Sequence, residues 1–200
     1  TVYTGSSDGD SIQFQSAALQ GSTILGEGGA DTINLNQGVV STTELGFIAK
    51  GGEGNDSIFV DPMVFKTSAA PTVMGEAGND TITISGGTLG LVQSQDGDDV
   101  VRATANVTLN SFAGGKNADD LVFSGTISSS LGMGRGHDKI SASVITFGSG
   151  LSASLKLGEG RDTIEATIND NGSALTFLGD AGNGTNAAAD SIDLEIGANN

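Results

Sequence analysis

A glycine-rich stretch followed by an aspartate and an aliphatic residue recurs along the whole chain. Its clearest copy is residues 51–59, GGEGNDSIF. Glycines permit backbone turns with positive φ, and a β-branched residue two places after the aspartate favours a strand. Alignment on this aspartate yields nine candidate copies, at Asp10, Asp31, Asp56, Asp80, Asp99, Asp120, Asp138, Asp162 and Asp190. A repeat that spans the chain predicts a stacked architecture instead of a conventional globular fold.

The residues after each aspartate predict a strand with one inward face. The residue two places on is Ile or Val in all nine copies, and the residue four places on is apolar in all but one, where it is Ser124. Residues two apart in a strand point to the same side of a sheet. The spacing of 18 to 28 residues between successive aspartates accommodates two strands and two turns. We therefore predict an all-β fold, a right-handed parallel β-solenoid of about nine coils.

Composition agrees with thin stacked layers better than with a globular core. The 200 residues include 32 glycines, 8 phenylalanines and one tyrosine, and they lack tryptophan and cysteine. Two prolines and no three-residue period exclude collagen, and regularly placed aliphatic residues argue against a disordered acidic chain. We predict a single domain over residues 1–200, with weak terminal coils at 1–20 and 179–200.

The charge balance favours cations as partners. With 8 basic and 24 acidic residues the formal net charge is −16, which argues against nucleic acid, because phosphate recognition needs clustered Lys and Arg. The absence of cysteine excludes a disulfide scaffold. The sequence has no transmembrane run and begins at Thr1 without a charged or apolar leader. We expect a mature chain, or a piece of a longer one, that is secreted and located at the cell surface.

The motif resembles the glycine- and aspartate-rich nonapeptide of RTX (repeats-in-toxin, hemolysin-type calcium-binding) proteins, G-G-x-G-x-D followed by an aliphatic residue. Residues 51–59 match it fully, and the copies at 26–34, 75–83, 132–140 and 158–166 match in part. The resemblance implies a β-roll in which carbonyls and the aspartate of one turn, with the aspartate of the adjoining turn, bind calcium. Family repeats run in tandem and place turns on both edges. Here the turn occurs once per coil, so several calcium ions are expected along one edge only.

Electrostatics leads to the same expectation. In-register stacking would place the aspartates about 5 Å apart, where two charges repel by roughly 1 kcal/mol in water and about 3–4 kcal/mol at a protein-surface dielectric. Calcium suits such a column because it accepts about 6–8 oxygen ligands in a flexible geometry. The predicted metal-binding residues are Asp10, Asp31, Asp56, Asp80, Asp99, Asp138, Asp162, Gly26, Gly28, Gly29, Gly52, Gly54, Gly75, Gly78, Gly97, Gly160, Asn55 and Asn79.

Several alternatives remain open at these turns. Glycine and aspartate are also ordinary turn formers, since Asp commonly bonds its own backbone. Four glutamates near the turns are either further ligands or solvated rim charges, and we favour the rim: Glu27, Glu53, Glu76 and Glu159. Lys116, Arg135 and Arg161 fall inside turns, where a side-chain cation can replace calcium by pairing with a carboxylate. Calcium is therefore expected mainly between the copies at 26–31, 51–56 and 75–80, with little or none in copies six and seven.

Other functions have weaker support. His137 is the only histidine, which excludes a multi-histidine metal site and makes it a turn residue by expectation. Parallel β-helices host polysaccharide lyases and epimerases, but neighbouring acids such as Asp98 and Asp99 point to opposite faces of a strand. We predict no enzymatic activity. Ser or Thr follows the aspartate in six copies, yet the next outward position varies too much for an ice-binding array.

The expected function is that of an extracellular structural protein, a calcium-stabilised RTX-like solenoid in a surface layer, a filament or an adhesin. Expected partners are calcium ions and either further copies of the chain or other cell-surface components. Self-association is expected because solenoid ends are open sheet edges. The alternative is an accessory RTX domain that aids secretion and folding of a larger secreted protease, lipase or epimerase.

Overall fold

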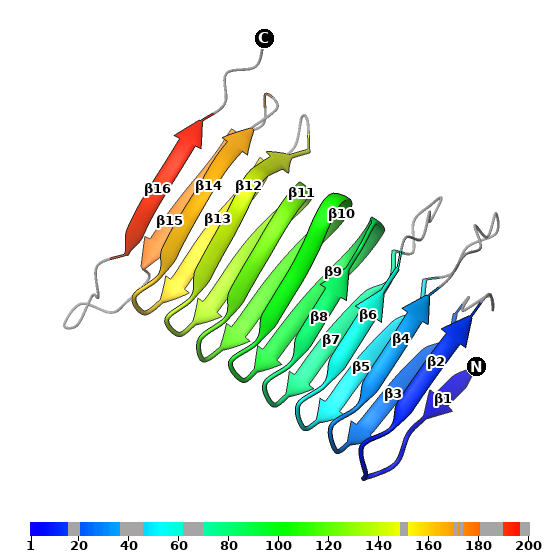
Figure 1. The fold of residues 1–200 in the computed structure, drawn as a ribbon. Helices are drawn as coiled ribbons and strands as arrows, with labels where there is room; N and C mark the ends of the chain where they lie inside the picture. The colour runs from blue at the N-terminus through cyan, green and yellow to red at the C-terminus, as the bar shows by residue number, and fades with distance from the viewer. Residues whose placement is uncertain are drawn as a thin grey trace.

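The strands of this protein wind into a parallel β-solenoid (Figure 1). The computed structural model describes residues 1–15, 21–36, 46–61, 70–148, 152–169, 172, 174–180 and 190–196. Over these ranges the regular structure consists of 16 β-strands in one continuous sheet and contains no helix. In the described ranges the pairings between neighbouring coils are parallel, and equivalent residues stack, as between Ile33 and Ile58 and then Ile58 and Ile82. Local register shifts follow Ala103, Val122 and Ala142. The predicted all-β solenoid is confirmed.

The glycine-aspartate turns lie along one edge and separate two sides of the solenoid. The strands before the turns are β1 (Val2–Thr4), β3 (Thr23–Gly28), β5 (Ile48–Glu53), β7 (Thr72–Ala77), β9 (Gly87–Asp96), β13 (Ser152–Glu159) and β15 (Ala174–Asp180). The strands after them are β2 (Ser11–Gln15), β4 (Thr32–Asn36), β6 (Ser57–Val60), β8 (Thr81–Ile84), β12 (Lys139–Phe147), β14 (Thr163–Asn169) and β16 (Ser191–Ile196). The long strands β10 (Val100–Lys116) and β11 (Asp120–Arg135) supply both sides of their coils, since β10 pairs first with β8 and later with β9.

The solenoid has about seven turns, fewer than the nine predicted. Seven motif aspartates are buried, from Asp31 to Asp162, whereas Asp10 and Asp190 are only partly buried. The first and last described coils each have one stacked neighbour instead of two. A motif copy therefore gives a complete turn only where further coils cover it on both sides.

The sixth copy is built on Asp119, and our alignment on Asp120 was wrong. Strand pairing places Asp120 one residue beyond the motif position. The inward pair of this coil is then Leu121 and Phe123, which are 0% and 1% exposed. With this register the apparent exception at Ser124 disappears. Two consecutive aspartates satisfy the motif equally well, and the choice between them is made by the apolar residues that must face the core.

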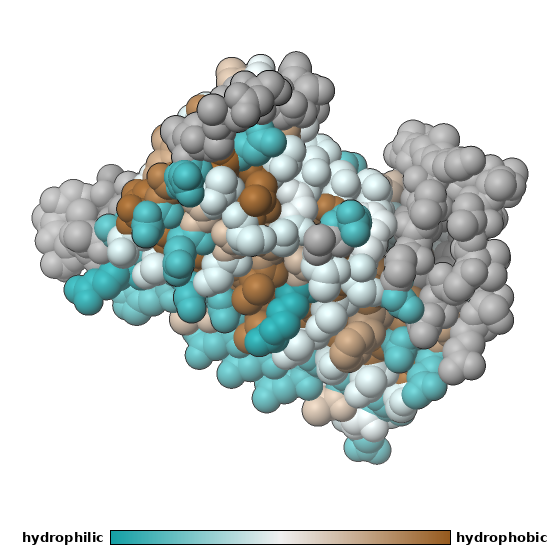
Figure 2. Space-filling model, turned by 45° about the horizontal axis from the view of Figure 1, so that its top comes forward, coloured by the Kyte–Doolittle hydropathy of each residue, from teal (hydrophilic) through white to brown (hydrophobic). Residues whose placement is uncertain are grey.

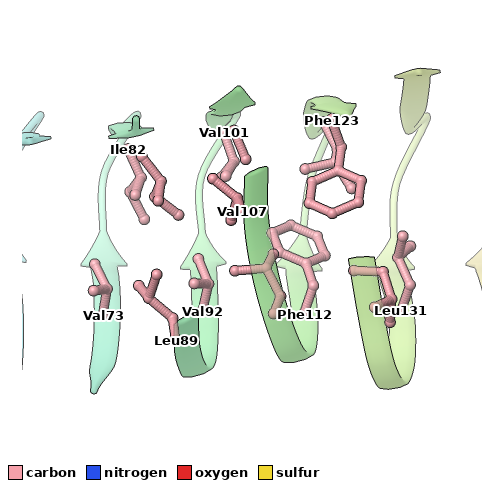
Figure 3. Close-up of a cluster of buried hydrophobic side chains, with 14 of the residues drawn as sticks. Val73, Ile82, Leu89, Val92, Val101, Val107, Phe112, Phe123 and Leu131 are labelled. Carbon is pink, nitrogen blue, oxygen red and sulfur yellow. The ribbon is translucent and has the colours of Figure 1, made fainter. Parts of the chain in front are cut away.

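Apolar side chains from the two sides meet along the axis. Figure 3 shows Ile82, Val101 and Phe123 pointing toward the layer formed by Val73, Val92, Phe112 and Leu131. All of these side chains are at most 2% exposed. Full burial of such a side chain stabilises a fold by about 1.5–3 kcal/mol. Each coil thus adds one thin layer to a continuous core, which brings the turns of successive coils into line.

The outer surface is mixed in character. On the face drawn in Figure 2, hydrophobic residues occur in small groups among hydrophilic and neutral ones. Exposed large apolar residues include Phe59, which is 45% exposed, and Val122, which is 39% exposed. In the ranges that the structure describes, helices suitable for crossing a bilayer are absent.

Candidate functional site: the aspartate ladder

The turns share one backbone conformation. In the turn that ends at Asp56, Gly52 and Gly54 have φ values of 119° and 120°. Two positions of the turn have positive φ in seven coils. Four places before the aspartate these are Glu27, Gly52, Glu76, Gln95, Gly115, Gly134 and Gly158. Two places before the aspartate they are Gly29, Gly54, Gly78, Gly97, Asn117, Gly136 and Gly160. Glycine adopts this conformation without steric cost, and in four of these positions Glu27, Glu76, Gln95 and Asn117 adopt it in place of glycine, so the same turn recurs from coil to coil. The aspartates are thereby stacked at equivalent positions.

Each motif aspartate after Asp10 bonds to the coil before it. The Oδ1 atom of Asp56 accepts a hydrogen bond from the backbone N–H of Asp31 at 2.8 Å, and Asp80 accepts one from Asp56 at 2.8 Å. Eight such bonds, of 2.6 to 3.2 Å, join Asp10, Asp31, Asp56, Asp80, Asp99, Asp119, Asp138, Asp162 and Asp190. We call this column the aspartate ladder. Its backbone donors offset part of the repulsion between stacked carboxylates.

A second ladder lies one residue earlier and runs in the opposite direction. The Oδ1 atom of Asn55 accepts the N–H of Asn79 at 2.8 Å, and Asn79 accepts that of Asp98 at 3.0 Å. His137 belongs to this ladder, since its Nδ1 atom accepts the N–H of Arg161 at 2.9 Å. This ladder was not predicted from the sequence, although Asn, Asp and His recur before the motif aspartate. The predicted ligands Asn55 and Asn79 use their side-chain oxygens to join coils, and His137 is confirmed as an exposed turn residue.

The second carboxylate oxygen of the ladder residues is buried without a donor. Among the described residues, Oδ2 has no hydrogen-bond partner in Asp31, Asp56, Asp80, Asp99, Asp119 and Asp138. These aspartates are at most 3% exposed. A buried anionic oxygen that lacks a donor is costly, and such groups are normally satisfied by a proton, a cation or an ordered water. Among the described residues, the ladder therefore has the buried oxygens suited to hold a small positive species.

Burial raises the pKa of the ladder carboxyls. It raises the pKa of Asp80 to about 7, of Asp119 to about 8 and of Asp138 to about 6. The pKa values of Asp56 and Asp99 are raised for the same main reason, loss of hydration. Backbone hydrogen bonds lower these pKa values in part, whereas the neighbouring ladder carboxylates raise the pKa of Asp80 and Asp119 further. Without a bound cation, several ladder residues hold protons close to neutral pH.

The unpaired oxygens lie against the first glycine of the motif. A Cβ atom added at Gly51 would lie 2.2 Å from Oδ2 of Asp56 and 2.6 Å from the carbonyl oxygen of Gly75. At Gly26, the corresponding oxygens belong to Asp31 and Gly51. A carboxylate oxygen and the carbonyl oxygen of the next coil thus converge on each glycine. Gly51 is part of this arrangement, although sequence analysis did not select it.

The glutamates predicted as rim charges lie on the rim. Glu27 and Glu53 are exposed. Glu76 pairs with Lys50 at 2.6 Å, and Glu159 pairs with Arg135 at 3.2 Å. Lys116 and Arg135 pair with carboxylates of the rim, Asp96 and Glu159, and not with the ladder, and the replacement of calcium by such side chains stays a prediction.

These rim pairs should contribute little to stability. Replacement of Lys116 by alanine breaks its 2.8 Å contact with Asp96, but the two side chains are 60% and 55% exposed. Water screens such a pair, and exposed ion pairs typically contribute less than about 1 kcal/mol. We expect Lys116→Ala to change the free energy of unfolding in urea by less than about 1 kcal/mol. A larger loss would mean that the rim, and not the core and ladder, holds these coils together.

The ladder matches calcium in the chemistry of its donors. Carboxylate and carbonyl oxygens are the ligands that calcium prefers. The acids form a column, however, and within the described ranges no three His, Cys, Asp or Glu side chains gather into one cluster. A cation at the ladder would therefore take one carboxylate oxygen from a rung, Oδ2, and carbonyl oxygens from the neighbouring turn.

No protein-family model, curated protein or solved structure matches this chain.

Proposed function

We propose that this chain is a calcium-stabilised structural solenoid of the RTX-like type. In this proposal it works outside the cell as a segment of a surface layer, a filament or an adhesin, and it catalyses no reaction. The observation that carries the proposal is the column of six buried Oδ2 atoms without hydrogen-bond partners. The parallel solenoid with its stacked aspartates is compatible with RTX-like repeats.

Calcium would act on this fold by linkage. Asp31, Asp56 and Asp80 would hold it through Oδ2, with carbonyl oxygens such as those of Gly51 and Gly75 beside them. The folded chain offers these oxygens in register, whereas the unfolded chain does not, so binding favours the folded state. With a net charge of −16, the free chain is expected to be expanded where calcium is scarce and to fold where calcium is abundant, as outside cells.

Chelation tests the metal part of the proposal. The full chain is compared in EDTA, in excess calcium and in excess magnesium, by circular dichroism, urea unfolding and elemental analysis of the dialysed protein. At a free calcium concentration about 100-fold above Kd, we expect stabilisation by about 2.7 kcal/mol per site. Magnesium, which requires a more regular octahedral shell, should stabilise the protein less. Equal stability in EDTA and calcium, with no bound metal, would overturn this part.

Assembly tests the structural role. Light scattering and negative-stain microscopy of the full chain should reveal calcium-dependent filaments or layers that disappear on chelation. Monomers at all concentrations in calcium would instead favour the accessory-domain alternative, in which the solenoid assists a larger secreted enzyme.

A further inference from the structure

Ser94 occupies a position that is apolar or glycine in the other coils from Asp10 to Asp162. The residue five places before the ladder aspartate is Gly5, Gly26, Gly51, Gly75 and Gly114 in five coils, and Met133 and Leu157 in two others. In the Asp99 coil it is Ser94, which is 0% exposed. Its Oγ atom has no hydrogen-bond partner among the described residues. A buried hydroxyl without a partner costs about 1–3 kcal/mol, so a ligand that bonds to Oγ would stabilise this turn.

Further unpaired oxygens lie close to Ser94. A Cβ atom added at Gly75 would lie 2.3 Å from Oδ2 of Asp80 and 2.7 Å from the carbonyl oxygen of Ser94, so both oxygens lie against Gly75 and close to each other. Oδ2 of Asp99, in the same turn as Ser94, is also buried and unpaired. Two carboxylate oxygens, a hydroxyl and a carbonyl therefore belong to adjacent turns of the ladder.

We infer that one cation site of the ladder, between the turns of Asp80 and Asp99, uses Ser94 as an additional oxygen ligand and binds a hard divalent cation more tightly than the other turns. This inference rests on the proposed calcium binding and specifies where it is strongest. Glycine contributes no side-chain oxygen in the other turns. Met133 and Leu157, both 0% exposed, place apolar groups at the same position in the turns of Asp138 and Asp162. Those C-terminal turns therefore bind the cation less tightly, although our sequence analysis included both aspartates among the ligands.

The test compares Ser94→Ala with wild type in the full chain. Calcium binding is measured by isothermal titration calorimetry, and terbium luminescence gives a second readout of oxygen-coordinated sites. Alanine keeps the Cβ atom and removes only Oγ, so the coil retains its packing. Ser154→Ala is the matched control, because Ser154 lies on β13, the strand before the turn of Asp162, and is partly exposed. Ser94→Gly, which copies the other turns, serves as the second variant.

The tightest calcium site should weaken by about tenfold or more in Ser94→Ala and Ser94→Gly, since even outer-shell changes at metal sites cost about 10–100-fold in affinity. The control should bind like wild type, and all variants should have the same circular dichroism. Unchanged tight binding in both Ser94 variants would overturn the inference while leaving the proposed function intact. Absence of calcium and terbium binding in wild type would overturn the proposed function, and the inference with it.

Discussion

Replacement of Gly54 by alanine is expected to destabilise the solenoid by about 4 kcal/mol. Gly54 has a φ of 120°, and an added Cβ atom would lie 2.1 Å from the carbonyl oxygen of Gly29 in the preceding coil. Residues held in unfavourable backbone regions cost about 1–3 kcal/mol, and overpacking costs a further 1–3 kcal/mol or so. The obstructing atom belongs to the backbone of a stacked turn, so it cannot rotate away as a flexible side chain would.

Urea unfolding followed by circular dichroism measures this loss. Gly28→Ala is the control in the same column of turns, because an added Cβ atom there would meet nothing closer than 3.7 Å, an ordinary contact. We expect the control to lie within about 0.5 kcal/mol of wild type. If Gly54→Ala were as stable as Gly28→Ala, the stacking of turns described here would be incorrect.

In the absence of divalent metal, stability is expected to fall as the pH rises from about 4 to about 8. Burial raises the pKa of Asp119 from 3.8 to about 8 in the folded protein. Below pH 3.8 the Asp119 carboxyl is protonated in both the folded and the unfolded chain, and its contribution to stability is fully present. As the pH rises further, the unfolded chain releases its proton while the folded chain retains it until its own pKa is reached, at about 1.4 kcal/mol per pH unit. The loss from Asp119 over this range is on the order of 5 kcal/mol, and Asp80 and Asp138 act in the same direction.

The measurement is the free energy of unfolding in EDTA at several pH values, for wild type and Asp119→Asn. Asparagine cannot ionise, and its Oδ1 atom can still accept the N–H of Asp99. The variant should therefore show a weaker pH dependence and exceed wild type in stability at pH values near 8. Asp193→Asn, at an exposed position of β16, is the control and should follow wild type. Wild-type stability that increases over this range would contradict the burial of protonated ladder carboxyls.

Much of the fold could be predicted because it depends on local rules. Ile58 and Val60 face the core as expected from alternation along a strand, and the glycines before Asp56 form the turn that they were predicted to form. The choice between Asp119 and Asp120 could not be made in this way. Both residues satisfy the motif, and only the pairing of neighbouring strands places Leu121 in the core.

The candidate site was predicted in position but not in chemistry. Sequence analysis placed the aspartates along one edge and expected only ions between them, whereas the structure adds a backbone donor to each rung, as between Asp31 and Asp56. The burial of Ser94 beside the ladder was also not predicted. A serine in a turn is unremarkable by itself, and its unpaired hydroxyl becomes visible only when the neighbouring coils enclose it.

The sequence by itself determined the solenoid class, the single turn edge and the inward pattern of apolar residues, because these follow from glycine conformation and from strand alternation within one repeat. The tertiary structure decided the register of the sixth coil, the number of complete turns and the hydrogen bonding of the carboxylates. These depend on contacts between residues 19 to 28 positions apart in the chain, such as Asp119 with Asp138 and Asp162 with Asp190. Stacking brings such residues together, and only stacking shields the ladder from water strongly enough to raise its pKa values.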